Sequence, residues 1–176
     1  MTARIRPAIA AEVAALHELA ALTFPLACPP STTEASKAAF IAEHLSVEAF
    51  GRYLRDARRD ITVAEDAGAL VGYAMLVHGE PADPDVAQAV RARPTAELSK
   101  LYVHPSHHGG GVASALVAAA VEAASRRKAV SVWLGVNQHN ARANRFYAKS
   151  GFETVGSKRF LVGDTWEDDW VRERPL

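Results

Sequence analysis

Residues 97–124 read ELSKLYV-HPSHHGGG-VASALVAAAVEAA. In the first part of this stretch Leu98, Leu101 and Val103 are apolar among polar neighbours, a pattern typical of a strand. The last part is rich in alanine, contains no proline and has apolar residues at helical spacing, which predicts a helix. In a glycine turn that opens into a helix, several backbone N–H groups point to one spot, and the helix dipole adds partial positive charge there. The stretch therefore predicts an anion site suited to phosphate or pyrophosphate.

Two common phosphate-binding motifs do not fit this turn. A P-loop requires Gly-Lys-Ser/Thr at the start of the helix, whereas this chain has Gly111-Val112-Ala113. A Rossmann fingerprint requires glycines near the first strand and an acidic residue at the end of the next strand. Here the turn lies past the middle of the chain, and the basic Lys128 precedes the next strand. Three glycines can also be only a loose helix cap, so their spacing alone leaves both alternatives open.

The composition is that of one folded domain, which we expect to span residues 1–176. Of the 176 residues, 49% are hydrophobic, which is enough for a core of its own. The formal net charge is zero, which argues against nucleic acid as a partner. The single cysteine, Cys28, cannot form an internal disulfide, and the scattered histidines predict no metal site. Charged residues from Glu12 onward interrupt the first apolar stretch, so we expect no signal peptide, no membrane partner and a cytoplasmic protein.

The remaining segments predict a mixed sheet with helices beside it. Strands are expected at residues 4–8, 61–65, 70–77, 97–103, 130–136, 152–162 and 165–172, and helices at residues 10–24, 31–44, 46–58, 112–124 and 140–150. Pro25 is expected to end the first helix. The order is strand, helices, three strands, helix, strand, helix and two strands, which indicates the α/β class, in a mixed α+β form.

Two motifs on this order of elements resemble the GNAT superfamily of N-acetyltransferases. Residues 103–113, Val-x-Pro-x-x-His-x-x-Gly-x-Ala, are similar to the loop that binds the pyrophosphate of acyl-CoA, whose pattern is Arg/Gln-x-x-Gly-x-Gly/Ala. Residues 140–152, Asn-x-x-Ala-x-x-x-Tyr-x-x-x-Gly-Phe, are similar to the second motif of the superfamily. His108 replaces the usual Arg or Gln, which keeps the backbone cradle but makes the side-chain contribution weaker and pH-dependent. The resemblance implies a mostly antiparallel seven-stranded sheet flanked by helices, with acetyl-CoA as co-substrate and no metal.

The resemblance also implies which residues contact acetyl-CoA. Backbone N–H groups of the loop would hold the pyrophosphate, and backbone groups of the preceding strand would pair with the pantetheine arm like an added strand. Asn140 would reach the same arm, or serve only as the cap of its helix, and Arg142 would meet the adenosine phosphates or remain a solvated charge. The expected cofactor-binding residues are Leu101, Val103, His108, Gly109, Gly110, Gly111, Val112, Ala113, Asn140 and Arg142.

Acetyl transfer to an amine requires a proton acceptor and a proton donor. An alkylamine has a pKa near 10.4, so only roughly one molecule in a thousand is the free nucleophile at pH 7. Glu97, at the start of the central strand, is the candidate that takes this proton through water, and its alternative role is a solvated strand end. Tyr147 matches the tyrosine with which the family protonates the CoA thiolate, and its alternative role is a core aromatic.

The expected acceptor is a small, polyamine-like primary amine. Asp164, Glu167, Asp168 and Asp169 crowd the last hairpin, where carboxylates would attract a polycation or be ordinary solvated turn residues, and the first three are the expected substrate-binding residues. Residues 132–169 also look like the bacterial spermine/spermidine acetyltransferase branch. Three alternatives remain, because loops determine acceptor choice: acetylation of a protein N-terminus or lysine, a catalytically silent acyl-CoA-binding module, and a detoxifier that acts on an antibiotic or an amino-acid analogue. The resemblance is also compatible with a homodimer.

Overall fold

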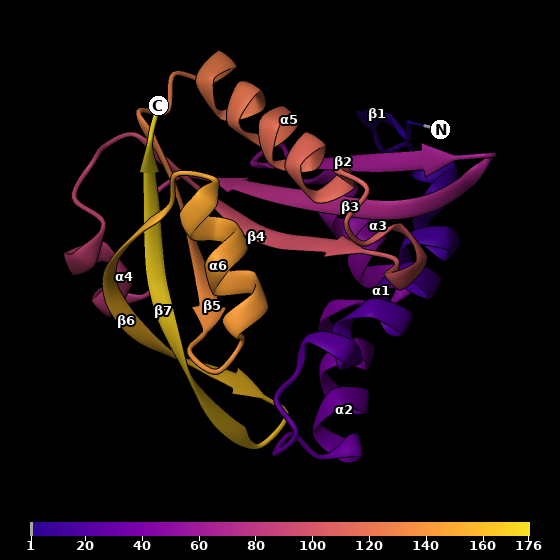
Figure 1. Ribbon diagram of the computed structural model, residues 1–176, viewed down its shortest axis with the longest axis horizontal. Helices are drawn as coiled ribbons and strands as arrows, with labels where there is room; N and C mark the ends of the chain where they lie inside the picture. The colour runs from indigo at the N-terminus through magenta and orange to yellow at the C-terminus, as the bar shows by residue number, and fades with distance from the viewer. Residues whose placement is uncertain (1) are drawn as a thin grey trace.

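Seven strands form one sheet in the computed structural model, which describes residues 2–176 (Figure 1). The strands are β1 (Arg4–Pro7), β2 (Arg59–Asp66), β3 (Ala69–His78), β4 (Thr95–Val103), β5 (Ser131–Asn137), β6 (Glu153–Val162) and β7 (Thr165–Pro175). The helices are η1 (Ala10–Glu12), α1 (Val13–Ala27), α2 (Glu34–His44), α3 (Val47–Arg55), α4 (Pro84–Ala89), η2 (Pro105–His107), α5 (Val112–Arg126) and α6 (Ala141–Lys149). The strand order is β1-β2-β3-β4-β5-β7-β6, and only the β4–β5 pair is parallel. The predicted mixed, mostly antiparallel sheet with flanking helices is confirmed.

The expected end of α1 at Pro25 is wrong. The helix continues through Pro25 to Ala27. Proline fits helical φ, and in the last turn the N–H that it lacks removes a single hydrogen bond of the ladder. The helix stops at Cys28, which is extended with ψ of 145°. Cys28 precedes Pro29, and a residue before proline avoids the helical region.

Helices cover both faces of the sheet (Figure 1). On one face α5 and α6 enclose a core that includes Leu116 and Phe152. On the other face α1, α2 and α3 enclose a core that includes Leu16 and Phe50. The helical stretch Ala10–Ala27 has the length and composition of a membrane-spanning helix. Leu16 lies in it and is fully buried against the sheet, as in a core helix.

The sheet opens between its two parallel strands. Thr95–Glu97 of β4 pair with Ser131–Trp133 of β5, and no pairing follows along the rest of either strand. Figure 1 shows the two strands diverging from this point, with β5 turning away from the direction of β4. The edge of β4 that faces β5 therefore keeps free backbone N–H and C=O groups, which can pair with an extended ligand.

A β-bulge at Ser99 sets which side chains of β4 face the opening. Leu98 lies opposite Leu76, and Lys100 lies opposite the adjacent residue Met75, so Ser99 is an extra residue. Side chains alternate along a strand, and the bulge shifts this alternation by one residue. Glu97 and Lys100 consequently lie on the same face, that of α1 to α3. The bulge also explains why the apolar residues of this strand, at positions 98, 101 and 103, do not follow strict alternation.

Candidate functional site

A cleft with a volume of about 860 Å³ lies where β4 and β5 part. Its walls come from β4, β5, α6, the hairpin of β6 and β7, and the helices α1 to α3. The predicted site residues that line it are Glu97, Leu101, Val103, His108, Ala113, Asn140, Arg142, Tyr147 and Glu167. The structure thus brings both predicted catalytic residues and most of the predicted cofactor residues to one cavity.

The loop before α5 has the geometry of an anion cradle. Gly109 and Gly111 have left-handed backbones, with φ of 78° and 83°, which L-residues with a side chain adopt at a cost. Gly111 is the N-cap of α5, and no side chain caps this 15-residue helix. The N–H groups of its first turn, including those of Val112 and Ala113, are therefore left for a ligand. Gly110 lies between the two left-handed glycines and is solvent-exposed. These features fit a pyrophosphate at this helix end.

His108 connects the end of β4 to α6. Its Nε2 lies 2.8 Å from the Val103 carbonyl oxygen, and its Nδ1 lies 2.9 Å from Arg142 Nη1. The guanidinium can only donate, so in this contact Nδ1 accepts and Nε2–H donates to Val103. Arg142 is thus held beside the anion cradle. Asn140 caps α6, because its Oδ1 accepts the N–H of Ala143 at 3.0 Å, and it also lines the cleft.

Tyr147 of α6 lines the cleft with a hydroxyl that has no hydrogen-bond partner among residues 2–176. Its ring packs edge-on against Phe146 and Phe152, with centroids 5.4 Å and 5.9 Å away. Burial raises the pKa of Tyr147 well above its ordinary value, so the hydroxyl keeps its proton. Tyr102 of β4 lines the same cavity, and the nearby Tyr147 adds to the burial that raises the pKa of Tyr102. Tyr147 is therefore placed to donate a proton into the cleft.

Glu97 and Lys100 are oppositely charged residues of β4, and burial shifts their pKa values in opposite directions. Burial raises the pKa of Glu97, and the positive charges of Lys158, Lys100 and Arg59 oppose the shift. Burial lowers the pKa of Lys100 to about 8, against the attraction of Glu97. A carboxylate with a raised pKa is a stronger base than an exposed glutamate. Glu97 can therefore accept a proton inside the cavity.

Lys158 of β6 and Asp169 of β7 converge over Gly135 of β5. A Cβ on Gly135 would lie 3.3 Å from Lys158 Nζ and 3.2 Å from Asp169 Oδ2, so both charged atoms approach the same point. The Asp169 side chain belongs to a residue only 5% exposed. Burial raises the pKa of Asp169 to about 6, while Lys158 pulls it down. A second opposed pair of charges thus faces the cleft from the β5 side.

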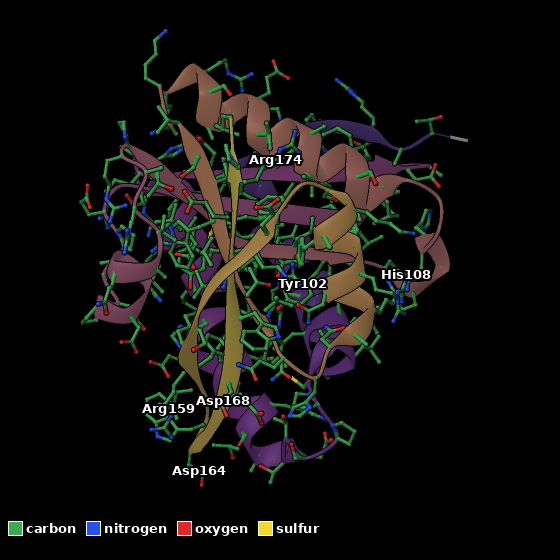
Figure 2. The ribbon with its side chains drawn as sticks, turned by 60° about the vertical axis from the view of Figure 1, so that its left-hand side comes forward. Tyr102, His108, Arg159, Asp164, Asp168 and Arg174 are labelled. Carbon is green, nitrogen blue, oxygen red and sulfur yellow. The ribbon has the colours of Figure 1, made fainter. Side chains whose placement is uncertain are left out.

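The acidic hairpin supplies two of its four acidic side chains, Glu167 and Asp169, to the cleft lining. Glu167 lines the cleft, whereas Asp168 is exposed and lies across from Arg159 on the outer face. Asp164 accepts a hydrogen bond of 3.0 Å from the Ser36 hydroxyl. Figure 2 shows Asp164 and Asp168 toward the tip of the hairpin, away from His108. The prediction that Asp164 and Asp168 face an amine is therefore corrected, because neither side chain lies in the cavity.

Sequence reasoning missed Lys100 and Lys158 as residues of the cleft, and it did not separate Glu167 and Asp169 from Asp164 and Asp168. A signal for this separation was present, because successive side chains of a strand point to opposite faces. Glu167 and Asp169 can share a face, and Asp168 cannot share it with either. Lys100 required the bulge, which the sequence does not reveal. No group of three or more His, Cys, Asp or Glu side chains in the described part of the chain could hold a metal ion.

Comparison with known proteins identifies this arrangement. The sequence model of the acetyltransferase (GNAT) family matches residues 14–152. An uncharacterized N-acetyltransferase of Mycobacterium tuberculosis is 46% identical over 161 residues, which is 92% of this chain and 96% of the relative.

Two solved structures share the fold. The PaiA N-acetyltransferase of Thermoplasma acidophilum, in complex with coenzyme A, has a TM-score of 0.78 and 19% identity, covering 100% of both chains. A ribosomal-protein-alanine N-acetyltransferase of Brucella melitensis has a TM-score of 0.70 and 25% identity, covering 98% of this chain and 99% of its own. The spermine/spermidine branch expected from the sequence stays a prediction.

Proposed function

The chain belongs to the acetyltransferase (GNAT) family, and we propose that it transfers the acetyl group of acetyl-CoA directly to a primary amine of a small molecule held in the cleft. The family's activity makes the chain an acyl-CoA-dependent N-acetyltransferase. The proposal concerns the class of acceptor and the residues that act on it. The predicted cytoplasmic location and homodimer stay predictions.

The closed end of the cleft is the observation that supports a small acceptor. Gly163, in the turn of the β6–β7 hairpin, packs so closely on α2 that a Cβ there would lie 2.6 Å from Ser36 Cα. Asp164 next to it accepts the Ser36 hydrogen bond. The hairpin tip is therefore fastened to α2 across one end of the cavity. A peptide substrate needs an open groove, so this contact disfavours the protein N-terminus and lysine alternatives.

Acetyl-CoA would bind with its diphosphate at the N-terminus of α5 and its pantetheine arm along the free edge of β4. Leu101 and Val103 offer the backbone groups of that edge. The thioester supplies an activated acetyl group. Arg142, held by His108, adds positive charge on the phosphate side. The Asn140 cap and a contact with the arm can coexist, because an amide has both donor and acceptor groups.

Proton movement then follows from two side chains of the cleft. Glu97 takes a proton from the ammonium group, directly or through water, which removes a deficit of about 4 to 5 kcal/mol in free amine at pH 7. The amine attacks the thioester carbonyl, the new C–N bond forms, the C–S bond breaks, and the nitrogen releases its second proton to water, from which Tyr147 regains the proton that it gives away. Tyr147 gives its proton to the departing thiolate. Its raised pKa keeps the hydroxyl protonated before that step.

A polyamine acceptor keeps limited support. Glu167, Asp169 and Glu97 offer carboxylates to a cationic chain, but Lys100 and Lys158 repel it from the same cavity. The fold alone cannot decide the acceptor, since a relative named for ribosomal-protein alanine shares it. The silent-module alternative requires that Tyr147 and Glu97 do no chemistry.

Release of CoA thiol by the purified protein tests the proposal. We expect Tyr147→Phe to lower kcat by roughly ten- to ten-thousand-fold, the range that general acids supply. Tyr73→Phe is the matched control, because its buried hydroxyl has no partner among residues 2–176 and lies outside the cleft lining. An unchanged kcat in Tyr147→Phe would remove this tyrosine from the mechanism. Turnover with peptides alone would move the assignment to protein acetylation.

A further inference from the structure

The charged side chains of the cleft indicate a second functional group on the acceptor, in addition to its amine. Resting on the proposed function, we propose that the acceptor carries a carboxylate close to its primary amine, and that Lys100 and Lys158 bind this carboxylate. The acceptor class is then amino-acid-like and zwitterionic. A polyamine would be excluded by the same two lysines.

The first reason is that the cleft is not an acidic funnel. Its lining carries the four carboxylates of Glu80, Glu97, Glu167 and Asp169 and the five cationic side chains of Arg58, Arg59, Lys100, Arg142 and Lys158. Asp164 and Asp168, which would have given negative charge in excess, lie outside the lining. A polycation gains no net attraction from a balanced set of charges. A molecule that carries one charge of each sign can contact both kinds of group.

The second reason is that Glu97, Lys100, Lys158 and Asp169 have no hydrogen-bond or ion-pair partner of their own in the described part of the chain. Within residues 2–176 none of them makes a side-chain hydrogen bond or an ion pair shorter than 4.0 Å. Elsewhere in the chain similar charges are paired, as in Arg93 with Glu80 and Arg127 with Asp60. A partly buried ammonium group without a partner loses hydration and gains little in return. A ligand anion would supply that partner.

The third reason is the position of the lysines around the amine site. Lys100 Nζ lies 5.9 Å and 5.8 Å from the ring centroids of Phe40 and Tyr53, on the α2–α3 side of Glu97. Arg59 also contacts the Tyr53 ring, with its Cζ 4.8 Å from the ring centroid. Its Nε, however, already donates a hydrogen bond of 3.1 Å to Asp56 Oδ2. Lys100 is therefore the cation of this wall that is available to an acceptor.

Lys158 is the second lysine that lines the cleft. It lies 5.0 Å from the Phe160 ring centroid and beside Asp169 above Gly135. Both lysines lie near enough to Glu97 for their positive charges to lower its pKa against the effect of burial. An amine at Glu97 would therefore be in the field of two ammonium groups, which attract a carboxylate one or two bonds from that amine.

The protonation behaviour of Lys100 agrees with this role. Burial lowers its pKa to about 8, so the charged form still predominates at neutral pH but is stabilised less than in water. A bound carboxylate favours the charged form, and the gain is larger where hydration is poor. An acceptor anion at this position is thus attracted more strongly than by an exposed lysine.

Matched acceptor pairs that differ by one carboxylate test the proposal. We would measure kcat/KM with acetyl-CoA for ornithine against putrescine, lysine against cadaverine, and phenylalanine against phenethylamine. The wild-type protein should prefer the carboxylate-bearing member of a pair by at least about tenfold. Lys100→Met and Lys158→Met should each reduce this ratio, through the KM of the acceptor and without a change in the KM of acetyl-CoA. Lys149→Met, an exposed lysine on α6, should leave the ratio unchanged.

Calorimetric binding of the same pairs to the protein saturated with CoA separates this proposal from the proposed function. Binding of the carboxylate-bearing member alone supports the acceptor class even where acetyl transfer fails. Acetylation of amines with no preference for the carboxylate would keep the proposed function and overturn this inference. Equal or stronger use of putrescine, retention of the ratio in Lys100→Met, or no binding by either member of any pair would also overturn it.

Discussion

Replacing Asp169 with asparagine should make the protein more stable, and by an amount that depends on pH. The side chain is only 5% exposed, and burial raises its pKa from an ordinary value of 3.8 to about 6. The folded state therefore binds this proton more tightly than the unfolded state, so the ionised carboxylate opposes folding once the pH exceeds the unfolded value. The cost grows between pH 3.8 and about 6 and is constant above that range. Asparagine has the same shape and carries no charge.

The pKa difference of about two units corresponds to about 3 kcal/mol at pH 8 and about 1 kcal/mol at pH 4.5. Urea unfolding of wild type and Asp169→Asn at both pH values measures these differences. Asp168→Asn is the control, because Asp168 is next to Asp169 on the same strand and this variant removes the same charge from the exposed face. It should change the free energy of unfolding by less than about 0.5 kcal/mol. Equal stabilisation at both pH values, or destabilisation at pH 8, would refute the reasoning that burial of this charge is unfavourable.

Two further predictions concern the proton acceptor and the glycine loop. Because burial raises the pKa of Glu97, the rise of kcat/KM with pH should have its midpoint above the ordinary glutamate value, and Glu97→Gln should remove this rise in thiol-release assays. A profile that Glu97→Gln leaves intact would assign the base elsewhere. Gly111→Ala should lower the free energy of unfolding in urea by about 1 to 2 kcal/mol. The residue has a φ of +83°, and no atom lies within 4 Å of the new Cβ, so backbone strain is the only cost of this substitution. Gly111→Asn should lose less, since asparagine tolerates this backbone, and equal losses would contradict the strain argument.

Local sequence was sufficient for most of the fold. Periodicity and punctuation predicted all seven strands, because each strand carries its apolar pattern within a few consecutive residues. The turn before β3 is an example, since Ala67 and Gly68 both have positive φ, as a tight hairpin requires. Pro25 misled the prediction, because a proline in a last turn loses too little to end a helix on its own. Tertiary packing of α1 outweighs that loss.

The residues predicted for the cofactor side lie together in the structure for a similar reason. The anion cradle consists of consecutive residues, and the helix N–H groups that form it need no distant partner. The acceptor side is different, because its charges come from β4, β6 and β7, far apart in the chain. Whether Lys100 faces the cleft depends on the bulge at Ser99, and a one-residue change in register reverses the face of a side chain. The acidic hairpin suggested a polycation because the number of its carboxylates was considered and the face of the strand on which each one lies was not.

Gly135 determines how close Lys158 and Asp169 can come to β5 on the acceptor side of the site. It lies on β5 at the opening from β4, and a side chain there would place its Cβ 2.5 Å from Lys158 Cε. Any larger residue would displace Lys158 and move it relative to Asp169, although neither side chain is a neighbour in sequence. The absence of a side chain on one strand thus fixes the charge arrangement contributed by two others. We therefore expect the acceptor to contact strands that the open sheet brings together, whereas the proposed anion cradle for the cofactor lies in one continuous segment.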